Sequence, residues 1–130
     1  MYGKERMLSK IHNCVVTQAN LEYEGSITIG RDLLKLTWMD ARDKVQVLDK
    51  ENVARIETYV IEGEESEICL NGAAANLFNV GDRIIIIQYG LQIMGVQKVV
   101  IEETRATDDF PKERIVVCDG TPANSIKEVK

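Results

Sequence analysis

Short apolar segments rich in Val, Ile, Thr and Tyr recur along the whole chain. Turn residues separate them, for example Glu62-Gly63-Glu64 and Gly81-Asp82. This pattern is typical of β-strands rather than of amphipathic helices. It predicts strands at residues 11–17, 26–29, 44–48, 53–61, 67–70, 83–89, 98–102 and 114–118.

Helical patterns are few and short. One helix is expected at residues 31–38, where leucines give an apolar side, and another at 72–77, where Asn71 occupies the N-cap position. Residues 120–130 are expected to form a mobile tail. Many short strands in one small unit predict a mainly β domain, either a barrel or a sandwich.

A sequence pattern that occurs twice suggests how such a barrel could be built. Residues 43–47 and 82–86 share the order Asp, cation, aliphatic, any residue, aliphatic, and each follows a predicted helix. Two related halves of this kind would close a barrel with pseudo-two-fold symmetry. The alternative is that an Asp-Lys or Asp-Arg pair before a strand is simply a common turn.

Length and composition limit the function. The chain has 130 residues, of which 45% are hydrophobic, so we expect a single domain over 1–130 that needs neither disulfide nor metal. Sixteen Lys and Arg against 21 Asp and Glu leave a net charge of −5. An acidic chain without a basic cluster disfavours nucleic-acid and anionic-membrane partners.

Metal binding and export are also disfavoured. Cys14, Cys69 and Cys118 are far apart and His12 is the sole histidine, so no zinc site of ordinary spacing can be written. The three cysteines read as small core residues, and reduced thiols fit a cytoplasmic location. No apolar segment suits a signal peptide or a membrane span.

The chemistry must come from an unusual source, because no phosphate-binding loop, HExxH motif or GxSxG elbow is present. The candidate is the pair Gly25-Ser26. Glycine tolerates a strained backbone and has no Cβ to block attack by the Ser26 hydroxyl on its carbonyl. Elimination and hydrolysis would leave a pyruvoyl group, a ketone that forms a Schiff base with an amine. An isolated Gly-Ser pair, however, is more often an ordinary turn.

The surroundings of this pair resemble a known family. The chain resembles the aspartate 1-decarboxylase family in four ordered blocks, at residues 7–29, 55–59, 71–75 and 80–86. The resemblance fades after Tyr89. Gln18 and Asn20 depart from the family pattern, but no departure touches Gly25, Ser26 or Tyr59.

The resemblance implies a double-psi β-barrel assembled as a homotetramer, with active sites between subunits. It implies self-cleavage into residues 1–25 and 26–130, a covalent pyruvoyl cofactor made from Ser26, and in some members a maturation helper protein. The implied reaction is decarboxylation of L-aspartate to β-alanine for pantothenate and coenzyme A synthesis.

The resemblance also implies residue roles. Tyr59 corresponds to the proton donor, and Thr58 to a residue that contacts substrate and helps to hold the Gly25 carbonyl. Neighbours on a strand point to opposite faces, so both can serve one site only beside a crevice or an interface. Arg55 and Lys10 correspond to cations for the substrate carboxylates.

A predicted helix start completes the expected site. Asn71 is a supporting residue, and Gly72, Ala73 and Ala74 would offer backbone N–H groups to a carboxylate. His12 matches a family histidine near the site and is given no role. Two alternatives remain: a non-catalytic barrel that binds a ligand, and a pyruvoyl decarboxylase for a related amino acid such as glutamate.

Overall fold

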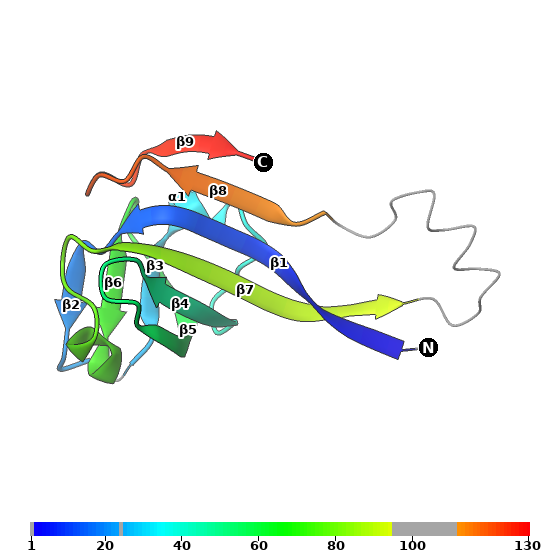
Figure 1. Ribbon diagram of the computed structural model, residues 1–130, viewed down its shortest axis with the longest axis horizontal. Helices are drawn as coiled ribbons and strands as arrows, with labels where there is room; N and C mark the ends of the chain where they lie inside the picture. Colours follow the sequence, from blue (N-terminus) through cyan, green and yellow to red (C-terminus); the bar gives the residue numbers. More distant parts are fainter. Residues whose placement is uncertain (1, 24, 95–111) are drawn as a thin grey trace.

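A single curved sheet dominates the computed structural model, which describes residues 2–23, 25–94 and 112–130 (Figure 1). The nine strands within these ranges follow the order β2-β6-β3-β5-β4-β7-β1-β8-β9. Their bounds are β1 Tyr2–Val15, β2 Gln18–Asn20, β3 Ile27–Gly30, β4 Lys44–Asp49, β5 Arg55–Gly63, β6 Ile68–Asn71, β7 Arg83–Met94, β8 Arg114–Cys118 and β9 Ile126–Val129.

The strand predictions are confirmed wherever the structure describes the chain; the strand expected at 98–102 lies outside the described residues. β1 and β7 are longer than expected and pair antiparallel over their whole length, from Tyr2 opposite Met94 to Val15 opposite Arg83. In Figure 1 the ends of these two strands project from the body of the molecule as a ribbon.

Both helices are shorter than predicted. The first, α1, spans only Arg31–Leu34, because the Thr37 hydroxyl donates to the Leu34 carbonyl at 3.0 Å and the Trp38 N–H turns away to the Ser9 hydroxyl at 2.7 Å. The second, η1, is a 3₁₀ helix at Gly72–Asn76. No helix of the described ranges is long and apolar enough to span a membrane.

The prediction of a mobile tail at residues 120–130 is wrong for residues 126–129. Ile126–Val129 form β9, which pairs antiparallel with β8. All four β9 side chains are exposed, so the strand is held by backbone pairing rather than by burial. Its sequence consequently lacks the alternation on which strand prediction depends.

The repeated pattern at residues 43–47 and 82–86 corresponds to two turns of the same geometry. The Asp43 carboxylate accepts from the N–H of Asp40 at 2.8 Å, and the Asp82 carboxylate accepts from the N–H of Asn79 at 3.0 Å. In each turn the aspartate N–H also donates back to the carbonyl three residues earlier, at 3.1 and 3.0 Å. The shared pattern is therefore more than a common dipeptide.

Each turn is bound by one valine from the other part of the chain, Val16 just after β1 or Val60 within β5. The carbonyl of Val16 accepts from Gly81 N–H at 2.8 Å, and Val16 N–H donates to Asp82 at 2.9 Å. Val60 makes the same pair of bonds with Arg42 and Asp43, at 2.7 and 3.0 Å. The two halves are thus interlocked.

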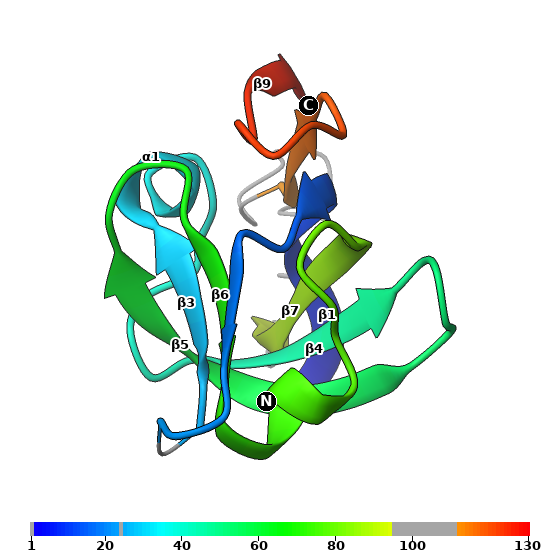
Figure 2. The ribbon, with the colours of Figure 1, turned by 90° about the vertical axis from the view of Figure 1, so that its left-hand side faces the viewer.

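The sheet encloses one apolar core, consistent with a β-barrel. Figure 2 shows β3, β5 and β6 on one side and β1 and β7 on the other. Alternate residues of β4 and β7 point inward, and the three cysteines are buried as predicted. The largest fully buried side chains are Phe78, Ile11, Ile27, Ile29, Leu33, Met39, Ile68, Leu70, Ile84, Ile86, Val15 and Val16.

Asn124 fastens the C-terminal segment to the barrel. Its buried side chain accepts from Val15 N–H at 2.7 Å and donates to the carbonyls of Val15 and Ser66 at 3.1 and 2.9 Å. The side chain thereby satisfies backbone groups of β1 and of the turn before β6.

We therefore expect Asn124→Ala to lower the free energy of unfolding by about 2–4 kcal/mol, since several buried polar groups lose their partners. Urea titration measures this loss. Asn124 has a φ of 50°, so Asn124→Gly, which relieves that strain, should lose nearly as much. The exposed neighbour Ser125 supplies the control Ser125→Ala; equal stability of all four proteins would contradict the role of the side chain.

Candidate active site

Gly25 and Ser26 lie at a pocket of about 450 Å³ between β5, β6 and η1. Ser26 directly precedes β3, and its side chain is buried. The pocket brings together seven of the residues singled out in the sequence with three others; its lining residues are Gly25, Ser26, Ile56, Glu57, Thr58, Tyr59, Asn71, Ala73, Ala74 and Leu77.

The backbone of the Gly-Ser pair is strained. Gly25 has a φ of +123° and Ser26 a φ of +91°. Positive φ costs a residue with a side chain on the order of 1–3 kcal/mol, and such residues concentrate at functional sites. The position that a Cβ of Gly25 would take meets no atom within 4 Å, so one side of the peptide is open.

Asn71, the last residue of β6, holds Ser26 through two hydrogen bonds. Its backbone N–H donates to the Ser26 carbonyl at 3.0 Å, and its side-chain Nδ2 donates to the Ser26 Oγ at 3.0 Å. Both residues are buried, so water does not compete for these bonds. The hydroxyl of Ser26 therefore has a defined position next to the strained peptide.

Gly72 allows the two backbones to approach. A Cβ on Gly72 would lie 2.8 Å from both the N and the Cα of Gly25, and 2.8 Å from the carbonyl oxygen of Tyr23. The φ of Gly72 is +65°, which also favours glycine. Gly72 thus lies close to the backbone of Gly25. This is a second role, beside the backbone N–H group that the sequence predicts it offers to a carboxylate.

Thr58 and Tyr59 both line the pocket, although they are neighbours on β5. Neighbours on a strand point to opposite faces, so both can serve one site only if the strand borders a crevice. β5 does border the pocket, which meets this condition. Thr58 is half-buried, whereas 41% of the Tyr59 side chain is exposed. Tyr59 therefore stands at the open side of the pocket.

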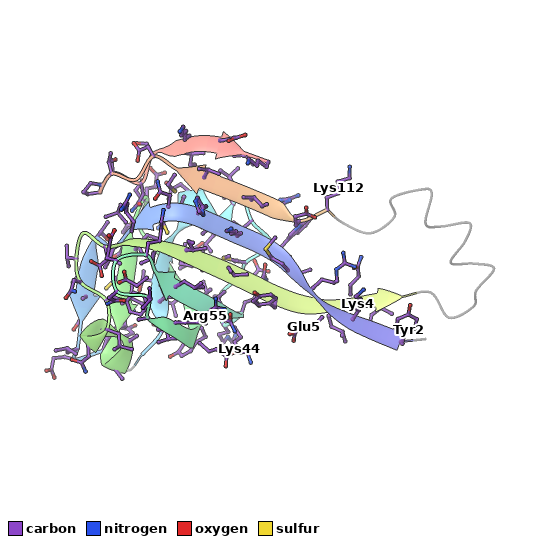
Figure 3. All side chains as sticks on the ribbon, viewed as in Figure 1. Tyr2, Lys4, Glu5, Lys44, Arg55 and Lys112 are labelled. Atoms are coloured by element: carbon purple, nitrogen blue, oxygen red, sulfur yellow. The ribbon has the colours of Figure 1, made fainter. Side chains whose placement is uncertain are left out.

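The two expected cations do not line this pocket. Arg55 is exposed on the face of β5 that also carries Glu57 and Tyr59, and its Nη1 donates to Gln46 Oε1 at 3.0 Å. Lys44, which is labelled together with Arg55 in Figure 3, pairs with Glu57 at 3.2 Å. Arg55 thus lies four residues along the strand from Tyr59 and faces solvent.

Lys10 is further away, because β7 and β4 separate β1 from β5 in the sheet. Lys10 and His12 follow each other on one face of β1, and His12 lies opposite Ile85 and Val117. Burial lowers the pKa of His12, and the charge of Lys10 adds to this effect. Within one chain, neither residue belongs to the Ser26 pocket.

Comparison with known proteins assigns this arrangement to a family. A family model described as aspartate decarboxylase matches residues 3–121. The chain belongs to the aspartate decarboxylase family. The resemblance drawn from the four sequence blocks is thereby confirmed, and with it the prediction that the chain is an enzyme.

Individual relatives agree with the family model. The aspartate 1-decarboxylase of Thermoanaerobacter pseudethanolicus is 55% identical over 120 residues, covering 91% of this chain and 95% of the relative. That of Bacillus pumilus is 53% identical over 94 residues, covering 71% and 74%. That of Desulfitobacterium hafniense is 55% identical over 87 residues, covering 65% and 68%.

Two polar residues near Ser26 were missed by sequence reasoning. Thr28 and Cys69 both contact the Asn71 side chain, at 3.0 and 3.2 Å. Thr28 was counted only as a strand residue and Cys69 as a core residue. Each lies two positions from a site residue on its strand, and side chains two apart share a face. In the described ranges, no group of three or more His, Cys, Asp or Glu is placed to hold a metal ion.

We expect Gly72→Ala to destabilise the protein more than Gly81→Ala. Both positions have positive φ, +65° and +95°, so both substitutions carry the backbone cost of roughly 1 kcal/mol. Only the Cβ at 72 meets other atoms, since nothing lies within 4 Å at Gly81. The difference in unfolding free energy measures the contact with Gly25; equal losses would refute a close approach.

Proposed function

We propose that this chain is a pyruvoyl-dependent decarboxylase that converts L-aspartate to β-alanine and CO₂ after cleaving itself between Gly25 and Ser26. The observation that carries the proposal is the strained Gly25-Ser26 peptide at a pocket, with the Ser26 hydroxyl held by Asn71. Family membership and relatives named aspartate 1-decarboxylase support the substrate.

Self-cleavage begins with the Ser26 Oγ, which attacks the Gly25 carbonyl carbon. The C–O bond forms, the C–N bond breaks, and the hydroxyl proton passes to the nitrogen, so the amide becomes an ester. Elimination then removes the Cα proton of residue 26 and breaks its Cβ–Oγ bond, which releases Gly25 as a carboxylate and leaves dehydroalanine at position 26. Water then displaces the nitrogen of dehydroalanine, which leaves as ammonia, and the product is a pyruvoyl group.

The surroundings of residue 26 fit such a group. It is no larger than serine, and the position is buried at the pocket with the Asn71 amide as a donor. Once formed, the pyruvoyl group supplies a ketone that condenses with the substrate amine and accepts the electron pair released with CO₂. Tyr59, at the open side of the same pocket, provides a proton for the substrate carbon.

Binding of two carboxylates needs several donors. Arg55 offers a bidentate fork, and the backbone N–H groups from Gly72 to Ala74 offer neutral donors beside the pocket. Thr58 contributes a hydroxyl that can contact the substrate and the Gly25 carbonyl. Lys10 does not line the pocket of its own chain, and β7 and β4 separate its strand from β5, which supports a site completed by a neighbouring subunit.

The proposed architecture is a double-psi β-barrel that assembles as a homotetramer. The reciprocal bonds of Val16 and Val60 to the two aspartate turns support interlocked halves of this kind. We propose a cytoplasmic location, which the three free, buried cysteines support, and, by the family resemblance, that the β-alanine feeds pantothenate and coenzyme A synthesis. A maturation helper protein is compatible with this scheme and is not required by it.

The function is tested by incubating the purified protein with L-aspartate and measuring β-alanine. Borohydride added during turnover should attach aspartate-derived mass to the peptide that begins at residue 26. Glutamate is the comparison substrate, because it differs by one methylene. Preference for glutamate would correct the substrate, and binding of aspartate with neither product nor adduct would indicate a non-catalytic barrel.

Tyr59→Phe removes one hydroxyl and keeps the ring, so it isolates the proton donor. We expect the variant to lose at least about 100-fold in kcat for β-alanine formation while still trapping aspartate with borohydride. Tyr89→Phe is a matched control, since 39% of Tyr89 is exposed and it lies on β7, outside the pocket lining. Normal turnover by Tyr59→Phe would exclude the role.

A further inference from the structure

A buried polar network lies behind Ser26, and Asn71 is at its centre. The two N–H bonds of Asn71 Nδ2 point to two hydroxyls, Ser26 Oγ and Thr28 Oγ1, each at 3.0 Å. Its Oδ1 accepts from the thiol of Cys69 at 3.2 Å. All four residues are at most 9% exposed, so every polar atom of the amide is paired inside the protein.

The pairing of β3 with β6 explains why these side chains meet. The register places Ile27 opposite Leu70 and Thr28 opposite Cys69. Ile27 and Leu70 enter the core, so the residues on either side of them share the opposite face of the two strands. Ser26, Thr28, Cys69 and Asn71 are therefore gathered by the strand register itself.

Thr28 and Cys69 do not line the Ser26 pocket. They line a separate polar hollow of about 370 Å³, together with Gln18 and Asn20 among others. Asn71 lines both hollows. The Asn71 side chain is bonded to Ser26, Thr28 and Cys69, so it is the group that links Thr28 and Cys69 to the Ser26 hydroxyl.

The thiol favours one orientation of the amide, because its Sγ lies 3.2 Å from Asn71 Oδ1, closer than the 3.8 Å to its other acceptor, the Leu70 carbonyl. A hydroxyl can donate or accept, so Ser26 and Thr28 would tolerate either amide orientation. A thiol donates to an oxygen and accepts only weakly, and burial raises the pKa of the Cys69 thiol, so it keeps its hydrogen. Cys69 therefore favours Oδ1 on its own side and the NH₂ group towards Ser26.

Amide orientation matters for a nucleophile. With the NH₂ group towards Ser26, the amide N–H stabilises the negative charge that develops on Oγ as the hydroxyl proton passes to the Ser26 nitrogen. With the amide reversed, the partial negative charge of Oδ1 would face Oγ and oppose that developing charge. The first orientation, which the structure contains, favours attack on the Gly25 carbonyl.

We infer that Cys69 and Thr28 are positioning residues for self-cleavage, which act on the Ser26 hydroxyl through the side-chain amide of Asn71. This inference rests on the proposed cleavage at Gly25-Ser26. It extends the machinery of maturation to two residues outside the Ser26 pocket.

The test measures the cleavage rate of freshly translated chain by denaturing mass spectrometry over time. Cys69→Ala should slow cleavage at least tenfold, and Cys69→Ser, which keeps a donor, should remain within about threefold of the unsubstituted chain. Thr28→Val should also slow cleavage, because one amide N–H loses its acceptor. Cys118→Ala removes another buried thiol, on β8, and should remain within twofold.

Two comparisons exclude a merely structural effect. In an Asn71→Ala background, Cys69→Ala should cause no further slowing, whereas its effect on the melting temperature should persist. Further tenfold slowing there would overturn action through the amide. If Cys69→Ala does not fold, Thr28→Val against Thr28→Ser decides the question.

Failure of this inference is distinct from failure of the proposed function. If the unsubstituted chain cleaves while Cys69→Ala and Thr28→Val cleave at the same rate, the positioning role is wrong and the function stands. If the unsubstituted chain never cleaves, both are wrong.

Discussion

The two hydrogen bonds from Asn71 to Ser26 are the constraint on which the site depends. One fixes the main chain of Ser26 and the other fixes its hydroxyl, at 3.0 Å each. A serine with positive φ would relax to an ordinary conformation without such restraint. Gly72 contributes in a different way. Because it has no Cβ, its backbone can lie close to the backbone of Gly25.

The interlocked barrel gives this restraint its rigidity. β6, which carries Asn71, pairs with β2 on one side and with β3 on the other, and β3 begins directly after Ser26. β3 also pairs with β5, the strand of Thr58 and Tyr59. Two pieces of the pocket thus belong to strands that flank the cleavage pair, so the geometry cannot change without breaking sheet pairing.

Much of this architecture could be predicted from the alternation of apolar residues. Strands with one face in the core, such as β4, carry a clear pattern in their sequence. β2 was missed because three residues cannot display a period, and β9 because all its side chains are exposed. Helix 31–38 was drawn too long because leucine spacing does not reveal the hydroxyl of Thr37, which ends it.

The candidate site was predictable only in part. The pair Gly25-Ser26 and the residues Thr58, Tyr59, Asn71, Ala73 and Ala74 do meet at one pocket. Arg55 and Lys10 lie outside it, since their positions depend on strand face and sheet order rather than on local sequence. Thr28 and Cys69 were overlooked because strand register, not composition, brings them to Asn71.

The most direct measurement is the intact mass of the purified protein under denaturing conditions. The account predicts two chains, residues 1–25 and 26–130, with the larger lighter by one ammonia than simple hydrolysis would leave it and blocked to N-terminal sequencing. A single uncleaved chain that nevertheless makes β-alanine from aspartate would contradict the account.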